Sequence, residues 1–317
     1  MPRKQKTKDF FINSGSSCYT EPFISLLCGV ALILISINIV AVCGVIILTG
    51  YTGLFSLGHA GFVSIGAYFS AVLCKDFGVP FILAMVLGGL VAALSSVIVG
   101  YPTLRGKLKG DYFAIAMMGF AEAIRLLFSN IYPYFNGALG LSGIPKKITL
   151  GNALLFAAVV IFFTYQYVHS QHGRLALSIR EQEVAAELIG VNVTKEKMKS
   201  LMISAFLCGV SGGMTAFYYT YMTPNTFSAE VSNNMLSAVV FGGMGSISGP
   251  VIASAILTAI PEVLRAVARW RLVIYGLLMV VVMLFRPEGL LGNRELSLYP
   301  LIKKYKEKKA GAKKGER

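Results

Sequence analysis

Long stretches of hydrophobic and uncharged polar residues alternate with short charged segments along the chain. The stretches that lack Asp, Glu, Lys and Arg are Pro22–Cys74, Phe77–Leu104, Leu126–Pro145, Ile148–Gly173, Ser200–Ala229 and Val231–Pro261. A helix needs about 20 mostly apolar residues to cross a membrane. Several of these stretches exceed that length, so the pattern predicts a protein with many membrane-spanning helices.

Basic segments between the apolar stretches predict the orientation, because positively charged loops of membrane proteins collect on the cytoplasmic side. These segments are Met1–Asp9, Arg105–Lys109, Arg174–Lys199 and Lys303–Arg317. Both termini are therefore expected in the cytoplasm. Met1–Asp9 lacks a following cleavage signal and is interpreted as a retained end. The predicted full spans are Phe23–Val40, Val79–Gly100, Tyr112–Ile131, Leu150–Val168, Leu201–Tyr221 and Leu272–Phe285.

Two tracts, Ala41–Cys74 and Val231–Pro261, contain too many glycines to form single regular spans. To keep the basic segments inside, each tract must begin and end on the outer side. Each tract then either dips in and returns, or crosses twice as two short helices. The fold is expected to be all-α, a polytopic helical bundle of about 8–10 transmembrane segments including the two glycine-broken tracts. This topology leaves Arg265, Arg269 and Arg271 outside, against the charge rule.

The two glycine-broken tracts occupy corresponding positions in the two halves of the chain. Such pairs point to the translocation pathway of a transporter, although small residues that let helices pack closely explain them equally well. His59 stands among glycines at membrane depth, where it either lines the route or is a satisfied packing residue. The pathway hypothesis therefore concerns Gly53, Ser56, Gly58, His59, Gly242, Gly243 and Gly245.

Composition agrees with a membrane protein. The chain has 317 residues, 55% hydrophobic and 14% charged, with a mean hydropathy of +0.68, whereas soluble domains carry about 25% charged residues. Its net charge of +14 lies mainly at the ends and in short loops, where basic residues fix topology and meet anionic lipid. No nucleic-acid partner is expected. The five cysteines show no C-x-x-C spacing and are interpreted as buried small hydrophobes.

The segment Arg174–Lys199 is an extended charged stretch between two apolar tracts, and it reads RLALSIREQEVAAELIGVNVTKEKMK. A partial apolar face is formed by Leu177, Val184 and Leu188, and Gly190 is a natural helix terminator. Asn192 or Thr194 is expected to cap the following helix. Because loops between spans are usually shorter than this, we interpret the segment as a docking element; the alternative is a solvated cytoplasmic loop.

Motifs for chemistry are missing from the sequence. There is no G-x-x-x-x-G-K-[ST] loop for ATP phosphates, and no metal cluster or catalytic triad is recognisable. Glu122 and Arg125, three residues apart, share a helix face and are expected to neutralise each other rather than to relay protons. The chain is thus predicted not to be an enzyme, and any energy for transport must come from another subunit or an ion gradient.

Several motifs, in order from about Gly50 to Gly292, resemble the permeases of branched-chain amino acid ABC importers. They are GYTGLFSLGHAGFVSIGAY, LRGKLKGDYFAIAMMGFAEAIRLLF, GLSGIP, IREQEVAAELIGVNVTKEKMKSLMISAFLCGVSGG, VVFGGMGSISGPVIASAI and RPEGLLG. The likeness is greater to the M-type than to the H-type subunit, chiefly through LRGKLKGDYFAI and RPEGLLG. The segment after Pro145 is brief before the next span and the tail is unusually rich in lysine, which are departures from the pattern.

This resemblance implies a bacterial inner-membrane complex with a second permease subunit, two ATPase subunits and an extracytoplasmic binding protein. The chain itself would bind no cofactor, because ATP is used by the partner subunits. It also implies a coupling helix over Arg180–Gly190. The implied coupling residues are Arg180, Glu181, Glu183, Ala185, Ala186, Glu187 and Gly190. The predicted parts are a basic cytoplasmic N-terminus (1–22), a permease domain (23–292) with the coupling segment 174–199, and a lysine-rich cytoplasmic tail (293–317).

Other functions remain open at this point. The same permease group also serves urea, short amides and other small amino acids, and the expected pathway is lined by backbone and small side chains that encode little chemistry. A stand-alone ion-coupled transporter is a second hypothesis, and few acidic groups at membrane depth argue against it. A membrane-embedded enzyme is a third, which the missing catalytic set disfavours.

Overall fold

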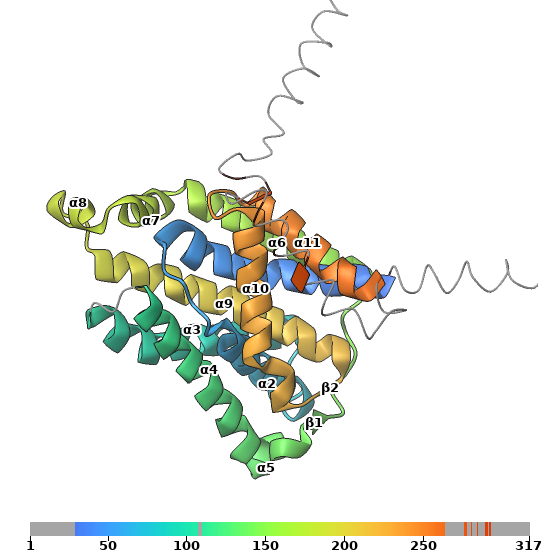
Figure 1. Ribbon diagram of the computed structural model, residues 1–317. Coiled ribbons are helices and arrows are strands. Elements are labelled where there is room, and N and C mark those ends of the chain that lie inside the picture. The colour runs from blue at the N-terminus through green and yellow to red at the C-terminus, as the bar shows by residue number, and fades with distance from the viewer. Residues whose placement is uncertain are drawn as a thin grey trace, which may run out of the picture.

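A computed structural model describes residues 29–106 and 110–263, together with 276, 277, 280, 284, 289, 290 and 292. Within these residues the protein is a bundle of helices with one pair of very short strands (Figure 1). Five helices are long and apolar enough to cross a membrane: Gly29–Gly50, α3 (Phe81–Arg105), α4 (Asp111–Asn130), α6 (Leu150–His169) and α9 (Val193–Tyr219). The expectation of an all-α polytopic bundle is therefore confirmed.

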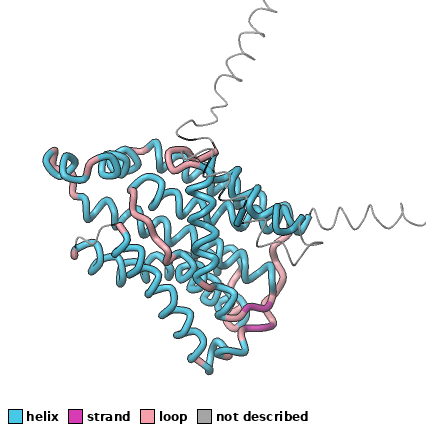
Figure 2. Tube along the Cα trace, in the orientation of Figure 1, coloured by secondary structure: helices cyan, strands magenta, loops and turns pink. Residues whose placement is uncertain are grey.

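Shorter elements complete the bundle. Three helices pack among the long ones, namely α2 (His59–Lys75), α10 (Ala229–Gly242) and α11 (Ser248–Val263). The first helix ends in η1 (Ile46–Gly50), a π-helical turn. The connecting elements are α5 (Tyr132–Phe135), η2 (Gly137–Leu139), β1 (Leu141–Ser142), α7 (Gln171–Glu181), α8 (Glu183–Leu188), β2 (Tyr221–Met222) and η3 (Pro224–Phe227). The strands pair antiparallel with Leu141 opposite Met222 (Figure 2).

Helix α9 lies at the centre of the bundle. Of its candidate membrane window 78% is buried inside the protein, against 28% for α4. The two ends of the bundle are identified by the elements on either side of α9, since α7 and α8 precede it and β2, which pairs with β1, follows it. We call the end with α7 and α8 the α7–α8 end and the end with β1 and β2 the hairpin end (Figure 1).

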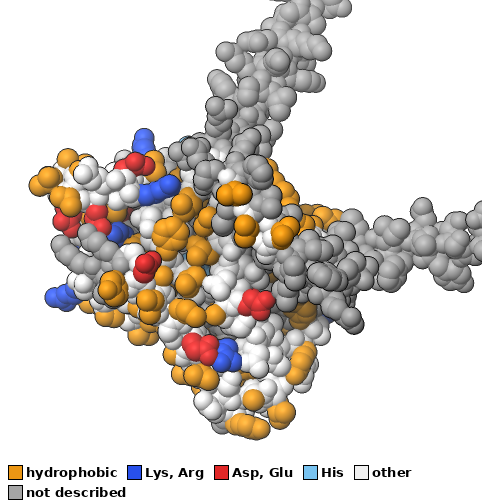
Figure 3. Space-filling view, viewed as in Figure 1, with side chains coloured by type: hydrophobic (Ala, Val, Ile, Leu, Met, Phe, Trp, Pro, Cys, Tyr) orange, Lys and Arg blue, Asp and Glu red, His pale blue; other side chains and the backbone are white. Residues whose placement is uncertain are grey.

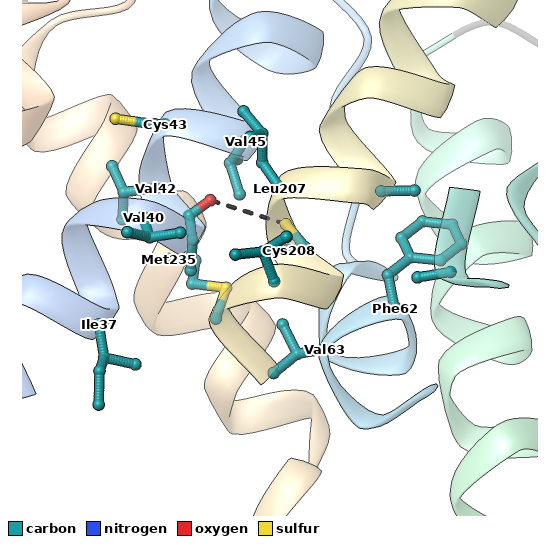
Figure 4. Packing of buried hydrophobic residues seen from close by; sticks show 14 of the residues in the cluster. Ile37, Val40, Val42, Cys43, Val45, Phe62, Val63, Leu207, Cys208 and Met235 are labelled. Atoms are coloured by element: carbon teal, nitrogen blue, oxygen red, sulfur yellow. Dashed lines mark hydrogen bonds between the residues drawn. The ribbon is translucent and has the colours of Figure 1, made fainter. Parts of the chain in front are cut away.

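Contacts with α9 give each helix its direction. His59 meets Ser204 and Ser70 lies beside Gly213, so α2 runs parallel to α9. The first helix runs the opposite way, because Ser211 Oγ donates to Ile37 O while Cys208 Sγ donates to Ala41 O. Figure 4 shows this thiol of α9 between the first helix and Met235 of α10.

Glycines bring α2, α3 and α9 into backbone contact. A Cβ atom on Gly66 would lie 2.1 Å from Gly209 O, and one on Gly212 would lie 2.0 Å from Val63 O. On its other side, Gly209 faces Gly89, whose Cα would be 2.9 Å from an added Cβ. Because lipid supplies no hydrophobic force between helices, such close packing by small residues is the main source of their association.

Four of the predicted spans correspond to observed helices, since Val79–Gly100, Tyr112–Ile131, Leu150–Val168 and Leu201–Tyr221 match α3, α4, α6 and α9. The predicted first span, Phe23–Val40, ends too early, because the helix continues to Gly50. The predictions for Leu272–Phe285, for Arg265, Arg269 and Arg271, and for the two chain ends lie wholly or almost wholly outside the described residues.

The predicted topology of the first broken tract is wrong. Ala41 was expected on the outer side, but the first helix runs toward the α7–α8 end, where Gly50 O accepts a hydrogen bond from Arg180 of α7. The interruption therefore follows the helix, over residues 53–58, and α2 then starts in the middle of the bundle beside Ser204. Gly44 lies inside the helix and packs on α9, so glycine content alone misplaced the break.

The second tract forms two antiparallel helices, one of the two arrangements considered for it. Helix α10 ends near the α7–α8 end, where Met244 O accepts from Arg180. Helix α11 then leads back, and Thr258 bonds Asn38 in the first helix. Gly242 and Gly249 form the contact between them, with an added Cβ on Gly249 only 2.2 Å from Gly242 O.

We expect Gly212→Ala to lower the melting temperature of the purified protein in detergent. The new methyl group has no space against Val63 O, and overpacking costs typically ~1–3 kcal/mol. The matched control is Gly119→Ala in the middle of α4, where nothing lies within 4 Å of an added Cβ. An equal loss of stability in both variants would contradict the role assigned to the α2–α9 contact.

Candidate functional site

The charged segment between α6 and α9 folds into two short helices at one end of the bundle. Ser170 caps α7 by accepting a hydrogen bond from Gly173 N at 3.4 Å. The predicted single coupling helix Arg180–Gly190 is wrong, because the chain leaves helical geometry at Gln182, with φ −157° and ψ 104°. Arg180 and Glu181 therefore belong to α7, while α8 carries Glu183 to Leu188.

The end of α8 and the start of α9 follow the predicted signals. Gly190 has φ +88°, its N–H bonds Glu187 O, and Val191 N–H bonds Ala186 O. This pair of bonds is a Schellman motif, in which glycine readily adopts the left-handed conformation. Asn192 Oδ1 then accepts from Lys195 N at 3.1 Å and caps α9. Gly190 as terminator and Asn192 as cap are confirmed.

Contacts between polar side chains hold α7 and α8 against the start of α9. Lys197 Nζ lies 3.1 Å from Glu183 Oε1, and the lysine side chain is only 8% exposed. His172 Nδ1 lies 3.0 Å from Glu196 Oε2, while Lys199 Nζ donates to the other oxygen of Glu196 at 2.8 Å. These contacts fasten the loop to the start of the central helix α9.

The outer surface of α8 is apolar. Val184, Leu188 and Ile189 are 61%, 83% and 77% exposed; we call these three residues the α8 knob. Glu181, Ala185 and Glu187 are also exposed, whereas Glu183 is partly buried. Charged side chains gather around this end of the molecule (Figure 3). An apolar knob with charged neighbours is the surface expected of a docking element.

Ala186 was grouped with the coupling residues, but its side chain points inward. It is buried with Ile179 of α7 and Val193 of α9 in a small hydrophobic cluster. Ala186 therefore helps to pack α8 against α7 and α9 and is not part of the exposed surface. Ile189 was missed as a candidate, although it continues the apolar face of Val184 and Leu188 directly before Gly190.

Arg180 connects this element to both broken tracts. Its Nη1 donates to Gly50 O at 2.6 Å and to Met244 O at 3.0 Å. Gly50 is the last residue of η1, and Met244 lies just after the end of α10. Carbonyl groups at helix ends have no hydrogen-bond donor within the helix. Arg180 is therefore a bridge from α7 to the end of the first helix and to the turn between α10 and α11.

Gly53 makes room for the Arg180 side chain. An added Cβ would lie 3.2 Å from Arg180 Cγ, and the φ of Gly53 is +71°, a conformation that other residues rarely adopt. The expected pathway residue Gly53 therefore lies beside the expected coupling residue Arg180.

The remaining candidates of the first tract are buried. His59 is 1% exposed and bonds Ser204 Oγ at 3.0 Å through Nε2 and Ser56 O at 3.2 Å through Nδ1. Ser56 is fully buried, and Gly58 packs on α4, where its Cβ would lie 2.4 Å from Met117 O. In this conformation these residues serve packing and hydrogen bonding, the alternative that the sequence left open for His59.

In the second tract, Gly242 packs against Pro250 of α11, where an added Cβ would lie 2.2 Å from the proline nitrogen. Gly243 has φ +106° and Gly245 follows it in the turn after α10. Leu290 N–H donates to Phe241 O at 2.8 Å, so a later part of the chain also reaches this turn.

The two tracts meet at two levels. At the α7–α8 end an added Cβ on Gly50 would lie 3.2 Å from Met244 O, and Arg180 bonds both residues. Deeper in the bundle Ser232 Oγ of α10 accepts from Ala60 N at 2.8 Å, a bond that satisfies a free amide in the first turn of α2. Ser232, Ser204 and Met244 were not singled out from the sequence, because their partners are distant in the chain.

The described residues form no disulfide bond and offer no cluster for a metal ion. Among the described residues no group of three or more His, Cys, Asp or Glu side chains is placed to hold a metal ion. The described cysteines Cys43, Cys74 and Cys208 are free thiols.

Comparisons with known proteins find similarity to permease proteins of branched-chain amino acid transport systems. Residues 28–283 match the family described as "Branched-chain amino acid transport system / permease component". The chain is 31% identical to the "High-affinity branched-chain amino acid transport system permease protein LivM" of Salmonella typhimurium and 30% identical to that of Escherichia coli, with 86% of this chain and 70% of each relative covered. The Escherichia coli LivH protein is 28% identical over 51% of both chains. No solved structure matches.

We expect Arg180→Ala to destabilise the protein, because it leaves Gly50 O and Met244 O without their donor. Hydrogen bonds to a charged group contribute about 1.5–3 kcal/mol, so the melting temperature in detergent should fall clearly. Arg174→Ala is the matched control, since Arg174 is exposed on the same helix and surface substitutions usually stay within about 0.5 kcal/mol. Arg180→Ala with unchanged stability would exclude the bridge as a structural connection.

Proposed function

The chain belongs to the family of permease components of branched-chain amino acid transport systems, and on that premise we propose that it is the passive membrane subunit of an ATP-driven importer. The multi-pass helical bundle is the part through which the substrate passes. The energy comes from separate ATPase subunits, because the sequence contains no G-x-x-x-x-G-K-[ST] loop to hold ATP phosphates. The chain then needs no cofactor of its own and is a transport subunit, not an enzyme.

The observation that carries the coupling mechanism is the double hydrogen bond of Arg180. The α8 knob offers an ATPase subunit an apolar anchor. An ion pair fastens α8 to α9, and the contact of His172 with Glu196 fastens α7 to it. Arg180 then extends this connection to the ends of the first helix and of α10. A movement of the docked ATPase subunit would in this way reach both broken tracts at once, and these tracts are the proposed gate of the pathway.

Charge distribution supports a cytoplasmic location for the α7–α8 end, since basic residues collect on that side of membranes. Basic residues described at this end are Arg105, Arg174, Arg180, Lys195, Lys197 and Lys199, and those at the hairpin end are Lys75, Lys146 and Lys147. The first helix then runs inward from the outer side. The predicted cytoplasmic N-terminus lies outside the described residues.

The proposed partners are those of an importer. They are a second permease subunit, two ATPase subunits that dock on the cytoplasmic side, an extracytoplasmic binding protein that meets the hairpin end, and the lipid bilayer. Branched-chain amino acids are the proposed substrates because the LivM and LivH relatives are named for their transport. Urea or a short amide is the alternative cargo, and uptake assays with both substrate classes separate them.

We expect Leu188→Glu to abolish docking of the ATPase subunits while the protein remains inserted and folded. Leu188 is 83% exposed, so the change leaves the bundle intact, and loss of a buried apolar anchor typically costs ~2 kcal/mol or more in binding. Copurification of the ATPase subunits and ATP-driven uptake in liposomes should both be lost.

The control for this variant is Leu139→Glu, an exposed leucine at the hairpin end, which should retain the ATPase subunits. Ala186→Arg is not suitable as a docking test, because Ala186 is packed inside. Normal copurification and uptake with Leu188→Glu would refute docking through the α8 knob.

Orientation is tested by single cysteines in a background without native cysteines. A cysteine at Val184 should react with an impermeant maleimide only from the cytoplasmic side, and one at Lys146 only from outside; both positions are exposed. A cysteine at Lys4 reports directly on the N-terminus. Reaction of Val184→Cys and Lys146→Cys from the same side would overturn the orientation.

A further inference from the structure

A salt bridge lies on the exposed face of α4. Arg125 Nε donates to both carboxylate oxygens of Glu122, at 3.1 and 3.0 Å, and Nη2 also contacts this carboxylate. Arg125 Nη1 donates to Asn225 Oδ1 of η3. The sequence predicted the ion pair from its spacing, but the third partner comes from a segment 100 residues away.

This cluster lies deep within the bundle. One turn before Arg125, Ala121 packs on Gly61 of α2, and just after it Phe128 stacks on Tyr68 of α2 with ring centroids 4.4 Å apart. The same stretch of α2 contains Gly66, which touches Gly209 in the middle of α9. The cluster is thus at mid-depth of the central helix α9, while along α4 it lies in the second half, with Arg125 five residues before the end at Asn130.

Both charged side chains are accessible at this depth. The Glu122 side chain is 46% exposed and that of Arg125 is 25% exposed, while Met118 and Leu126 on the same helix are 44% and 49% exposed. Charged groups inside a membrane are costly and almost always face a water-filled cavity or another protein surface. We infer that this face of α4 lines an aqueous route and is not in contact with lipid.

We propose that Glu122, Arg125 and Asn225 form a binding station for the charged head of a zwitterionic amino acid on its way through the membrane. A guanidinium group has five N–H donors, of which the observed contacts use three, so two remain for the carboxylate of a ligand. The half-exposed carboxylate of Glu122 is a matching acceptor for the ligand ammonium group. This inference rests on the proposed function and names the substrate class of the pathway.

Charge balance distinguishes a zwitterion from other ligands. The station carries one positive and one negative charge, so an amino acid with both charged groups leaves the occupied station without net charge at membrane depth. A simple amine or carboxylate would leave one charge uncompensated there. Urea or a neutral amide has no charged group to bind Arg125 or Glu122. The station therefore favours a zwitterion over these uncharged ligands.

If the ion pair had only a structural role, its replacement by apolar residues would leave transport unchanged. A double variant distinguishes this role from a binding station. In Glu122→Leu with Arg125→Leu, both positions become apolar, which suits a surface that meets only lipid or protein. The assay uses the complete complex in proteoliposomes, with the ATPase subunits and the binding protein. We expect ATP-driven leucine uptake to fall about tenfold or more, with unchanged melting temperature and copurification of the ATPase subunits.

Retained leucine uptake in the double variant would overturn the station. Tyr112→Gln is the matched control, because Tyr112 is exposed in the first turn of the same helix, away from the ion pair, and the change should leave uptake nearly unchanged. If the unaltered complex shows no ATP-dependent uptake of any substrate, the proposed function fails instead. Failure of the station and failure of the importer function are thereby distinguishable.

A second measurement detects binding without transport. A single cysteine at Leu126 of the complex, one turn from Glu122, is modified by a small maleimide in the presence of leucine, 3-methylbutylamine or 4-methylpentanoate. We expect leucine to slow the modification, and each analogue, which lacks one of the two charged groups, to have little effect. Equal protection by either analogue, or none by leucine, would contradict a zwitterion site.

Discussion

Backbone contact between α2 and α9 is the constraint on which the rest of the structure depends. Helix α2 starts in the middle of the bundle, so its first amide groups need partners where no bulk water reaches. Ser232 supplies one of these partners, and His59 ties the same turn to Ser204. The bond between His59 and Ser204 requires α2 to lie directly on α9, which glycines at 66, 209 and 212 allow.

The same contact explains why two tracts from different halves of the chain lie side by side. With α2 fixed on α9, the residues before α2 are directed to the α7–α8 end, and α10 is held against the start of α2. Gly50 and Met244 then present carbonyl oxygens at one place. A guanidinium group donates in several directions at once, so one arginine joins both helix ends to α7.

The packed helices also position two exposed features, the α8 knob and the ion pair of Glu122 and Arg125. The α8 knob projects from a loop that Lys197 and Glu183 brace, so the exposed apolar side chains are part of a rigid surface. The ion pair of Glu122 and Arg125 is likewise held in place by Asn225 from η3. In both cases the exposed residues lie on helices that contacts with another element hold in place.

Local pattern alone determined much of this protein. Runs of uncharged residues located α3, α6 and α9, and the predicted span Tyr112–Ile131 matched α4. Gly190 and Asn192 marked the end of α8 and the cap of α9, because capping depends on neighbours within one turn. The spacing of Glu122 and Arg125 was also sufficient to predict their ion pair. Motifs in chain order indicated the family, since these motifs are contiguous.

Only the tertiary structure decided where the glycine breaks lie and what the candidate residues contact. Gly44 and Gly53 look alike in sequence, yet one packs on α9 within a continuous helix and the other turns the chain beside Arg180. Ala186 points inward, and Arg180 bonds carbonyls 130 and 64 residues away. The physical reason is that a small residue permits close approach without specifying the partner, and a backbone carbonyl carries no side-chain signature.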